Sequence, residues 1–248
     1  VFDDKELHPK YLKTANLYLD SIISATGEFD GEFKEIPNIG EGYYWNPILG
    51  KVEPLNHSHA MGNSLVMIYL ITGSDKYKEM AKKLGKYFIS SVRTEKNGSY
   101  VWGYRPTPEN KKDDIGEPVW KGQITISLPL LLYHYGIMFN ENDMHALAKT
   151  FMENVYLGNS RFNMYIGADK KRPLCSEKNR GLVSGIGGWI LLDRFDPEIR
   201  VVIEQAVANR TDIFPGGWFG DIKLTIAYNH RLQSIPREHI SKIADKLK

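Results

Sequence analysis

Three pairs of helix-forming segments constrain the fold of this 248-residue chain more than any other feature. The pairs cover residues 57–92, 122–155 and 179–209, and a short polar link joins the two helices of each pair. Links of a few residues join antiparallel helices. The first helix of a pair is apolar on most sides and the second has one apolar face, so the first is expected to be enclosed and the second to cover it.

This pattern predicts an all-α fold, in which residues 1–248 form a single α/α-toroid domain. The toroid would be an incomplete barrel of antiparallel helical hairpins, with short β segments in the long loops. Two further stretches have helical periodicity, an amphipathic helix over 9–25 and a last pair over 221–248. The Gly- and Pro-rich segment over 40–54 is predicted as a loop. The long links all follow a second helix, so they would lie at one end and form a cleft there.

Composition limits the classes of partner. The formal net charge is +2, with 32 basic and 30 acidic residues, which does not indicate a nucleic-acid-binding protein. No apolar run is long enough to cross a membrane. The single cysteine, Cys175, excludes an intramolecular disulfide and a cysteine-rich zinc site. The sequence starts at Val1, which is compatible with a removed signal peptide, and our expectation is a secreted or periplasmic protein.

The segment over 98–123 is long for a connection between helices and is rich in aromatic residues. Tyr100, Trp102 and Tyr104 alternate with smaller residues, as they would on one edge of a short strand. Flat aromatic rings beside the cations Arg105 and Lys121 are typical of a site for sugars that carry carboxylates. The alternative is that Trp102 and Tyr104 close the core beneath a loop.

The helix predicted from residue 57 begins with the motif Asn56-His57-Ser58-His59, and Asn63 follows one turn later. One interpretation is a capped helix start whose histidines pack against a loop. A second is a metal site, since His-x-His is a known ligand spacing, with a third ligand from the acidic segment over 113–117.

The acidic segment contains Asp113, Asp114 and Glu117 and leads directly into the next apolar helix. Paired carboxylates could be the acid and base of a glycosidase. They could equally form a solvated turn or complement the helix dipole. The residues that open this helix, at the level of His57 in the previous pair, are Trp120, Lys121 and Gln123.

Taken together, the paired helices, the Asn-His-Ser-His start, the aromatic strand with Tyr104 and Arg105, and the turn Asp-Asp-Ile-Gly over 113–116 resemble the α/α-toroid polysaccharide lyases that cleave uronic-acid polymers. The uronyl C5-epimerases are near neighbours of these lyases. The motifs that carry the resemblance lie within residues 53–123. It implies an acidic polysaccharide as substrate, β-elimination as the reaction, and no cofactor.

The resemblance also implies roles for individual residues. Tyr104 or a histidine, His57 or His59, would take the C5 proton of a uronate, and Asn56, His57 or Arg105 would neutralise its carboxylate. The substrate-binding residues would be Trp45, Asn63, Trp102, Asp114, Trp120, Lys121 and Gln123, with Tyr44 and Trp218 as further aromatic platforms.

Two alternatives use the same residues differently. A glycoside hydrolase would use Asp114 or Glu117 as the acid, with a second carboxylate such as Glu53. A non-catalytic glycan-binding protein would need the aromatic rings and the cations without a poised tyrosine or histidine.

Overall fold

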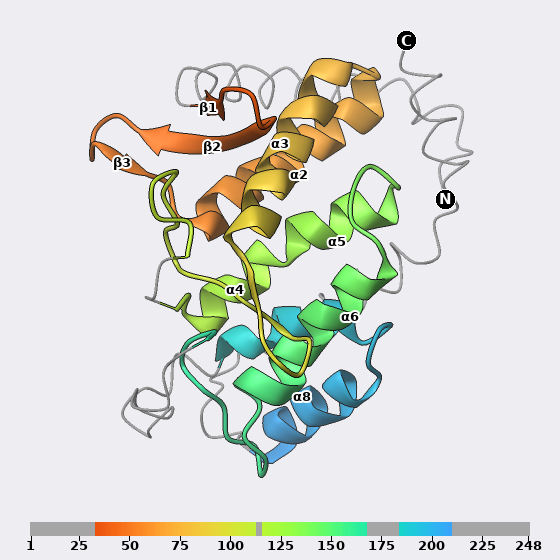
Figure 1. Cartoon of the computed structure of the whole chain (residues 1–248). Coiled ribbons are helices and arrows are strands. Elements are labelled where there is room, and N and C mark those ends of the chain that lie inside the picture. The colour runs from red at the N-terminus through yellow and green to blue at the C-terminus, as the bar shows by residue number, and fades with distance from the viewer. Residues whose placement is uncertain (1–32, 113–115, 168–183, 210–248) are drawn as a thin grey trace, which may run out of the picture.

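The computed structural model describes residues 33–112, 116–167 and 184–209 (Figure 1). The helices predicted over 9–25 and 221–248 lie outside these residues. The same is true of four residues named above, Asp113, Asp114, Cys175 and Trp218.

Two small antiparallel sheets accompany the helices. Strands β1 (Phe33–Ile36), β2 (Glu41–Asn46) and β3 (Lys51–Val52) form one sheet in that order, and β4 (Arg93–Thr94) pairs with β5 (Tyr100–Val101). The prediction of an all-α fold is therefore wrong, and the chain mixes helices with sheets. Gly40, Pro47 and Gly50 of the segment predicted as a loop lie in the turns between strands, and Gly40 and Gly50 have the positive φ that such turns favour.

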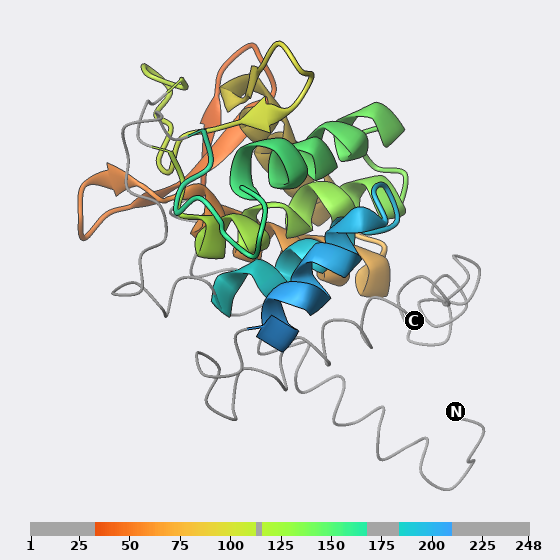
Figure 2. The same cartoon turned by 90° about the horizontal axis from the view of Figure 1, so that it is seen from below.

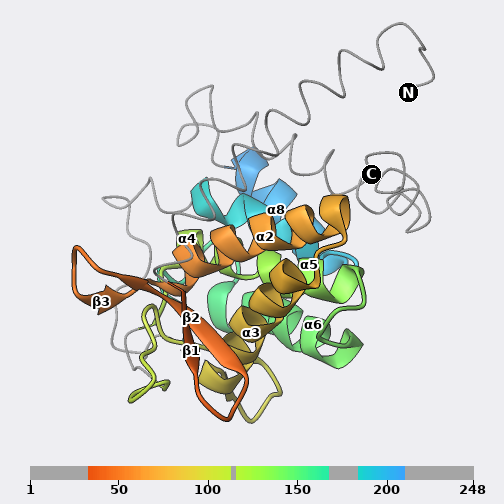
Figure 3. The same ribbon diagram turned by 90° about the horizontal axis from the view of Figure 1, so that it is seen from above.

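The three-stranded sheet contributes to the core. Tyr44 of β2 is buried with Leu65 from one helix and Leu84 from the next, and its ring meets Phe33 of β1 edge to face. Gly42 passes so close to the helix over 75–91, α3, that an added Cβ would lie 3.2 Å from the Lys83 Cβ. Figure 3 shows the sheet lying along this helix.

The first predicted helical pair is confirmed. Helix α2 (Leu55–Thr72) and helix α3 (Asp75–Ser91) pack against each other, and Gly73 and Ser74 join them. Gly73 has a φ of 70°, the left-handed conformation that commonly ends a helix. One face of α3 is buried, including Met80, Leu84 and Phe88.

The second pair is less regular than the sequence predicts. The expected single helix over 122–138 is two short helices, α4 (Val119–Thr125) and α5 (Ser127–His134). Pro129 has no N–H to donate to the Thr125 carbonyl four residues earlier, so the hydrogen-bond ladder is interrupted there. Its partner begins as α6 (Glu141–Lys149), with a capping box at Asn140, and continues as a π-helical turn, η1 (Thr150–Val155).

The third pair consists of the 3-10 helix η3 (Ser184–Leu192) and helix α8 (Glu198–Asn209). Two glycines let η3 lie close to α4, because a Cβ on Gly185 would be 2.0 Å from the Trp120 Cβ and one on Gly188 would be 2.5 Å from the Gln123 Oε1. Figure 2 shows η3 and α8 beside the helices of the second pair. The predicted α/α toroid is wrong, because interrupted helices and a core-forming sheet replace its uniform hairpins.

Candidate functional site

The starts of α2 and α4 meet beside the segment that carries Tyr104. The Leu55 N–H donates to the Tyr104 carbonyl oxygen at 3.3 Å, which places this segment against the first turn of α2. The Lys121 ammonium of α4 donates to the Tyr104 hydroxyl. The sequence pattern predicts that the helices beginning near residues 57, 122 and 179 start at one end beside the long loops. The first two starts do lie together beside this loop, and residue 179 lies outside the described residues.

Two cations surround the Tyr104 ring. The Lys121 Nζ lies 4.2 Å from its centroid and 4.9 Å from that of Trp120, and the Arg105 guanidinium carbon lies 5.7 Å from the Tyr104 centroid. All four side chains are half-buried. Positive charge in this position can hold a ligand carboxylate, and it can also hold negative charge on the phenolic oxygen when its proton leaves.

A chain of hydrogen bonds orients His57 in the first turn of α2. The Leu49 N–H donates to Asn46 Oδ1 at 2.9 Å, and Asn46 Nδ2 donates to Glu53 Oε1 at 2.5 Å. The other oxygen of Glu53 lies 2.8 Å from His57 Nδ1. With the proton on Nδ1, the neutral imidazole keeps a free lone pair on Nε2. The His57 side chain is 59% exposed, so this nitrogen can meet a solute.

Glu117 lies beneath the site and has no exposed surface. It accepts hydrogen bonds from Trp102 Nε1 at 2.6 Å, from Thr125 Oγ1 at 2.8 Å and from the backbone N–H of Asn56. Burial raises the pKa of its carboxyl group to about 8, although these donors and the Lys121 charge oppose the shift. Glu117 is therefore mostly protonated at neutral pH, and it cannot reach a glycosidic oxygen in this conformation.

His59 is a core residue, although the sequence analysis named it as catalytic. It is 1% exposed, and its Nδ1 lies 2.5 Å from the Thr125 carbonyl oxygen that Pro129 leaves without a helical partner. Its ring meets Phe88 edge to face at 5.1 Å. Burial lowers the pKa of His59 to about 4, so the imidazole is neutral and serves the packing of α2 on α4.

Trp102 is also a core residue, which makes it unavailable as a sugar platform. It is 1% exposed and stacks on Trp189, with ring centroids 6.3 Å apart. The predicted strand ends at Val101, so the three aromatic rings do not share one exposed edge. The alternative interpretation, that this residue closes the core, describes Trp102 correctly. Trp45 and Trp120 keep part of their surface exposed and can still face a ligand.

The three predicted amide residues have structural contacts. Gln123 accepts from the Gly188 N–H at 2.8 Å and links α4 to η3, and Asn63 donates to Ser127 Oγ at 2.6 Å. Asn56 is buried, and its side-chain Oδ1 has no hydrogen-bond partner among the described residues. Asn63 and Gln123 therefore join helices, although the Asn63 Oδ1, like the Asn56 Oδ1, has no partner among the described residues.

Sequence reasoning missed Asn46. The spacing of Glu53 and His57 is a visible signal, because residues four apart across a helix start can meet. The contact from Asn46 depends on the β2–β3 hairpin, which was read as a loop. The sequence therefore indicated the contact of Glu53 with His57 but not the contact of Asn46 with Glu53.

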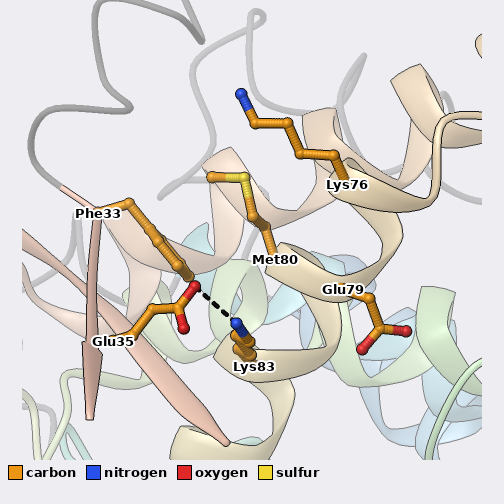
Figure 4. Close-up of a pocket in the computed structure, with 6 residues that line it drawn as sticks. All are labelled: Phe33, Glu35, Lys76, Glu79, Met80 and Lys83. Atoms are coloured by element: carbon orange, nitrogen blue, oxygen red, sulfur yellow. Dashed lines mark ion pairs between the residues drawn. The ribbon is translucent and has the colours of Figure 1, made fainter. Parts of the chain in front are cut away.

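A separate pocket of about 430 Å³ lies between β1 and α3 (Figure 4). Its lining combines apolar and charged side chains, and one pair, Glu35 and Lys83, forms an ion pair at 2.6 Å. The complete lining is Phe33, Glu35, Lys76, Glu79, Met80 and Lys83. None of these residues was predicted to bind substrate.

Within residues 33–112, 116–167 and 184–209, no three His, Cys, Asp or Glu side chains converge to hold a metal ion. No helix in these ranges is long and apolar enough to cross a membrane. Comparisons with protein-family models, with curated proteins and with solved structures give no match to this chain. Its function has to be argued from the residues themselves.

Proposed function

We propose that the surface around Tyr104 binds an acidic, uronate-containing polysaccharide and cleaves it by β-elimination. The observation that carries the proposal is the contact of the Lys121 ammonium with the Tyr104 hydroxyl, beside a histidine that Glu53 orients. These groups come from the starts of α2 and α4 and from the segment after β5, and they combine a proton-exchanging phenol, an oriented imidazole and local positive charge.

The chemistry of β-elimination needs each of these parts. The C5 proton of a uronate is weakly acidic because the neighbouring carboxylate carries negative charge, so the enzyme must neutralise that carboxylate and stabilise an enolate-like charge. Lys121 and Arg105 supply positive charge for this. The His57 Nε2 and the Tyr104 oxygen are the two groups that can take the C5 proton, and the Tyr104 hydroxyl can give a proton to the leaving O4 oxygen.

The alternatives fit these residues less well. A hydrolase needs two carboxyl groups that reach the glycosidic bond, and among the described residues Glu117 is fully buried and Glu53 is hydrogen-bonded to Asn46 and His57, while Asp114 lies outside the described residues. A binding protein has no need for an oriented imidazole beside a phenol. We therefore favour the lyase.

Incubation of the protein with a panel of uronate polymers tests the proposal. A lyase produces an unsaturated product that absorbs in the far ultraviolet, a hydrolase produces reducing ends without this absorbance, and a binding protein produces neither. Release of reducing ends alone would contradict the lyase proposal, and so would binding without any product.

The matched variants are Tyr104→Phe and Tyr100→Phe. Tyr104→Phe removes only the hydroxyl group, so turnover should fall by about 10²–10⁴-fold with binding nearly unchanged. Tyr100→Phe is the control, because its hydroxyl donates to Asp143 at 2.8 Å on α6 and should not affect turnover. A Tyr104→Phe variant within about threefold of the wild type would reject the role of this residue in proton exchange.

A further inference from the structure

Glu117 forms hydrogen bonds with all three segments that carry the proposed site. Its anchors are Asn56 on α2, Trp102 after β5 and Thr125 on α4. Each anchor is a close neighbour of one proposed site residue: Asn56 precedes His57, Trp102 is two residues before Tyr104, and Thr125 is one helical turn after Lys121. One buried carboxyl group therefore fixes the relative positions of the imidazole, the phenol and the ammonium.

The three anchors are all hydrogen-bond donors, and two of them use different oxygens of Glu117. Trp102 Nε1 reaches Oε2 and Thr125 Oγ1 reaches Oε1. An indole N–H can only donate, whereas a threonine hydroxyl can also accept. A glutamine at this position can satisfy both groups, with its oxygen toward Trp102 and its amide toward Thr125. Glu117→Gln therefore keeps the shape of the cluster and its hydrogen bonds to Trp102 and Thr125, and it removes the ionisation.

Among residues 33–112, 116–167 and 184–209, Lys121 on α4 is the charged side chain whose field acts on Glu117. The first turns of α2 contribute the neutral imidazole of His59 and the Asn56 backbone, and the segment after β5 contributes the Trp102 indole. When Glu117 is neutral, the Lys121 charge is available to Tyr104 and to a ligand. When Glu117 is ionised, its negative charge opposes part of the Lys121 charge through space, without an ion pair between the two side chains.

We infer that Glu117 is a positioning residue that controls the contact between Lys121 and Tyr104, and that its ionisation weakens the hold of this site on acidic ligands. The role of Glu117 in the contact between Lys121 and Tyr104 is inferred from the structure alone, whereas its effect on ligands rests on the proposed function. Because burial raises the pKa of Glu117 to about 8, the change falls between neutral and alkaline pH.

The first arm of the test needs no ligand. In the full chain labelled at tryptophan and tyrosine, NMR would follow the Trp102 indole N–H and the Tyr104 ring from pH 6 to pH 9. Both signals should move together with a midpoint near pH 8 in the wild type. Neither should move in that way in Glu117→Gln. The Tyr69 ring is the internal control, since it lies near the opposite end of α2, where Lys78 contacts its ring at 5.1 Å, and its signal should stay constant.

A Trp102 signal that moves without the Tyr104 signal would overturn the inference, because Glu117 would then titrate without affecting the Lys121 contact. A wild-type Trp102 signal that does not move, or a Glu117→Gln variant that keeps the transition, would also overturn it. Circular dichroism at both ends of the pH range checks that the fold is retained.

The second arm measures the affinity for oligogalacturonate at pH 6.5 and at pH 9. The wild type should bind about fivefold more weakly at the higher pH, the upper range for a partly exposed charge pair, and Glu117→Gln should bind equally at both. An equal loss in the variant would overturn the effect on ligands. If the wild type binds no uronate polymer and forms no unsaturated product, the proposed function fails, and the NMR result still decides the role of Glu117 in the contact.

Discussion

At the scale of single residues, Glu117 should make the stability of the fold depend on pH. Its pKa is raised from 4.5 to about 8, so between these values the folded protein holds a proton that the unfolded chain has lost. The free energy of unfolding should therefore fall as the pH rises through this window, by at most about 1.4 kcal/mol per pH unit. Urea denaturation at several pH values from 5 to 8 measures this slope. Glu117→Gln should lack it, and an equal slope in the variant would assign the effect to another group.

His59 should have the opposite effect at lower pH. Its pKa is lowered from 6.5 to about 4, so between these pH values the unfolded chain binds a proton at His59 and the folded protein does not. Its contribution to stability is complete above pH 6.5 and is lost as the pH falls toward 4. His59→Asn keeps a donor for the Thr125 carbonyl and should remove this acid-side loss, although it is less stable at pH 7 because packing on Phe88 is reduced.

The control for this prediction is His145→Asn, since the His145 side chain is 49% exposed. Denaturation at pH 7 and at pH 4.5 should give the same difference in unfolding free energy for this control as for the wild type. A His59→Asn variant that behaves like the control would show that a different residue causes the acid-side loss.

At the scale of elements, the contact of η3 with α4 should be sensitive to a single methyl group. A Cβ on Gly185 would lie 2.0 Å from the Trp120 Cβ and 2.4 Å from its Cα, so the backbones of the two helices would have to separate. Gly185→Ala should lower the free energy of unfolding by about 1–3 kcal/mol, the usual cost of overpacking. Urea denaturation would measure this change in the free energy of unfolding, with the slope of that free energy against urea concentration unchanged. A change below about 0.5 kcal/mol would mean that the helices are not in such close contact.

Some elements of the fold could be predicted from the sequence and others could not. Helical periodicity and Gly73 predicted the α2–α3 hairpin, because both signals are local. Pro129 was visible inside an apolar run, but the run was read as one helix, and the break at Ile126 follows from the missing N–H. The first sheet was missed because its strands have two to six residues and its turns contain the Gly and Pro that mark loops.

The candidate site also has features that could be predicted from the sequence and features that could not. The neighbourhood of Tyr104 and Lys121 was predictable, since Lys121 lies at the helix start that follows the segment carrying Tyr104. The burial of His59, Trp102 and Glu117 was not, because it depends on elements distant in the sequence. Trp102 is covered by Trp189 of η3, and His59 is bonded to a carbonyl that only a break in another helix makes available.

At the scale of the whole molecule, the charge is nearly balanced, with a formal net charge of +2. A balanced protein exerts little long-range attraction on an acidic polymer, so binding has to depend on local cations. Lys121→Ala and Arg105→Ala should each lower the affinity for a uronate polymer by roughly 10–100-fold, the loss of a charge-assisted hydrogen bond of about 1.5–3 kcal/mol. The fold should persist, because both side chains are only half-buried.

Lys96→Ala is the matched control for this prediction, because it changes the net charge by the same amount at an exposed position on the β4–β5 turn. If attraction were set by the net charge, the control would lose as much affinity as the two site variants, and the loss would disappear at high salt in all three. If the cations at Tyr104 hold a carboxylate, only Lys121→Ala and Arg105→Ala lose affinity, and binding of a neutral polymer stays unchanged. Equal losses for acidic and neutral polymers would mean that these two residues support the fold instead of holding the charge of a ligand.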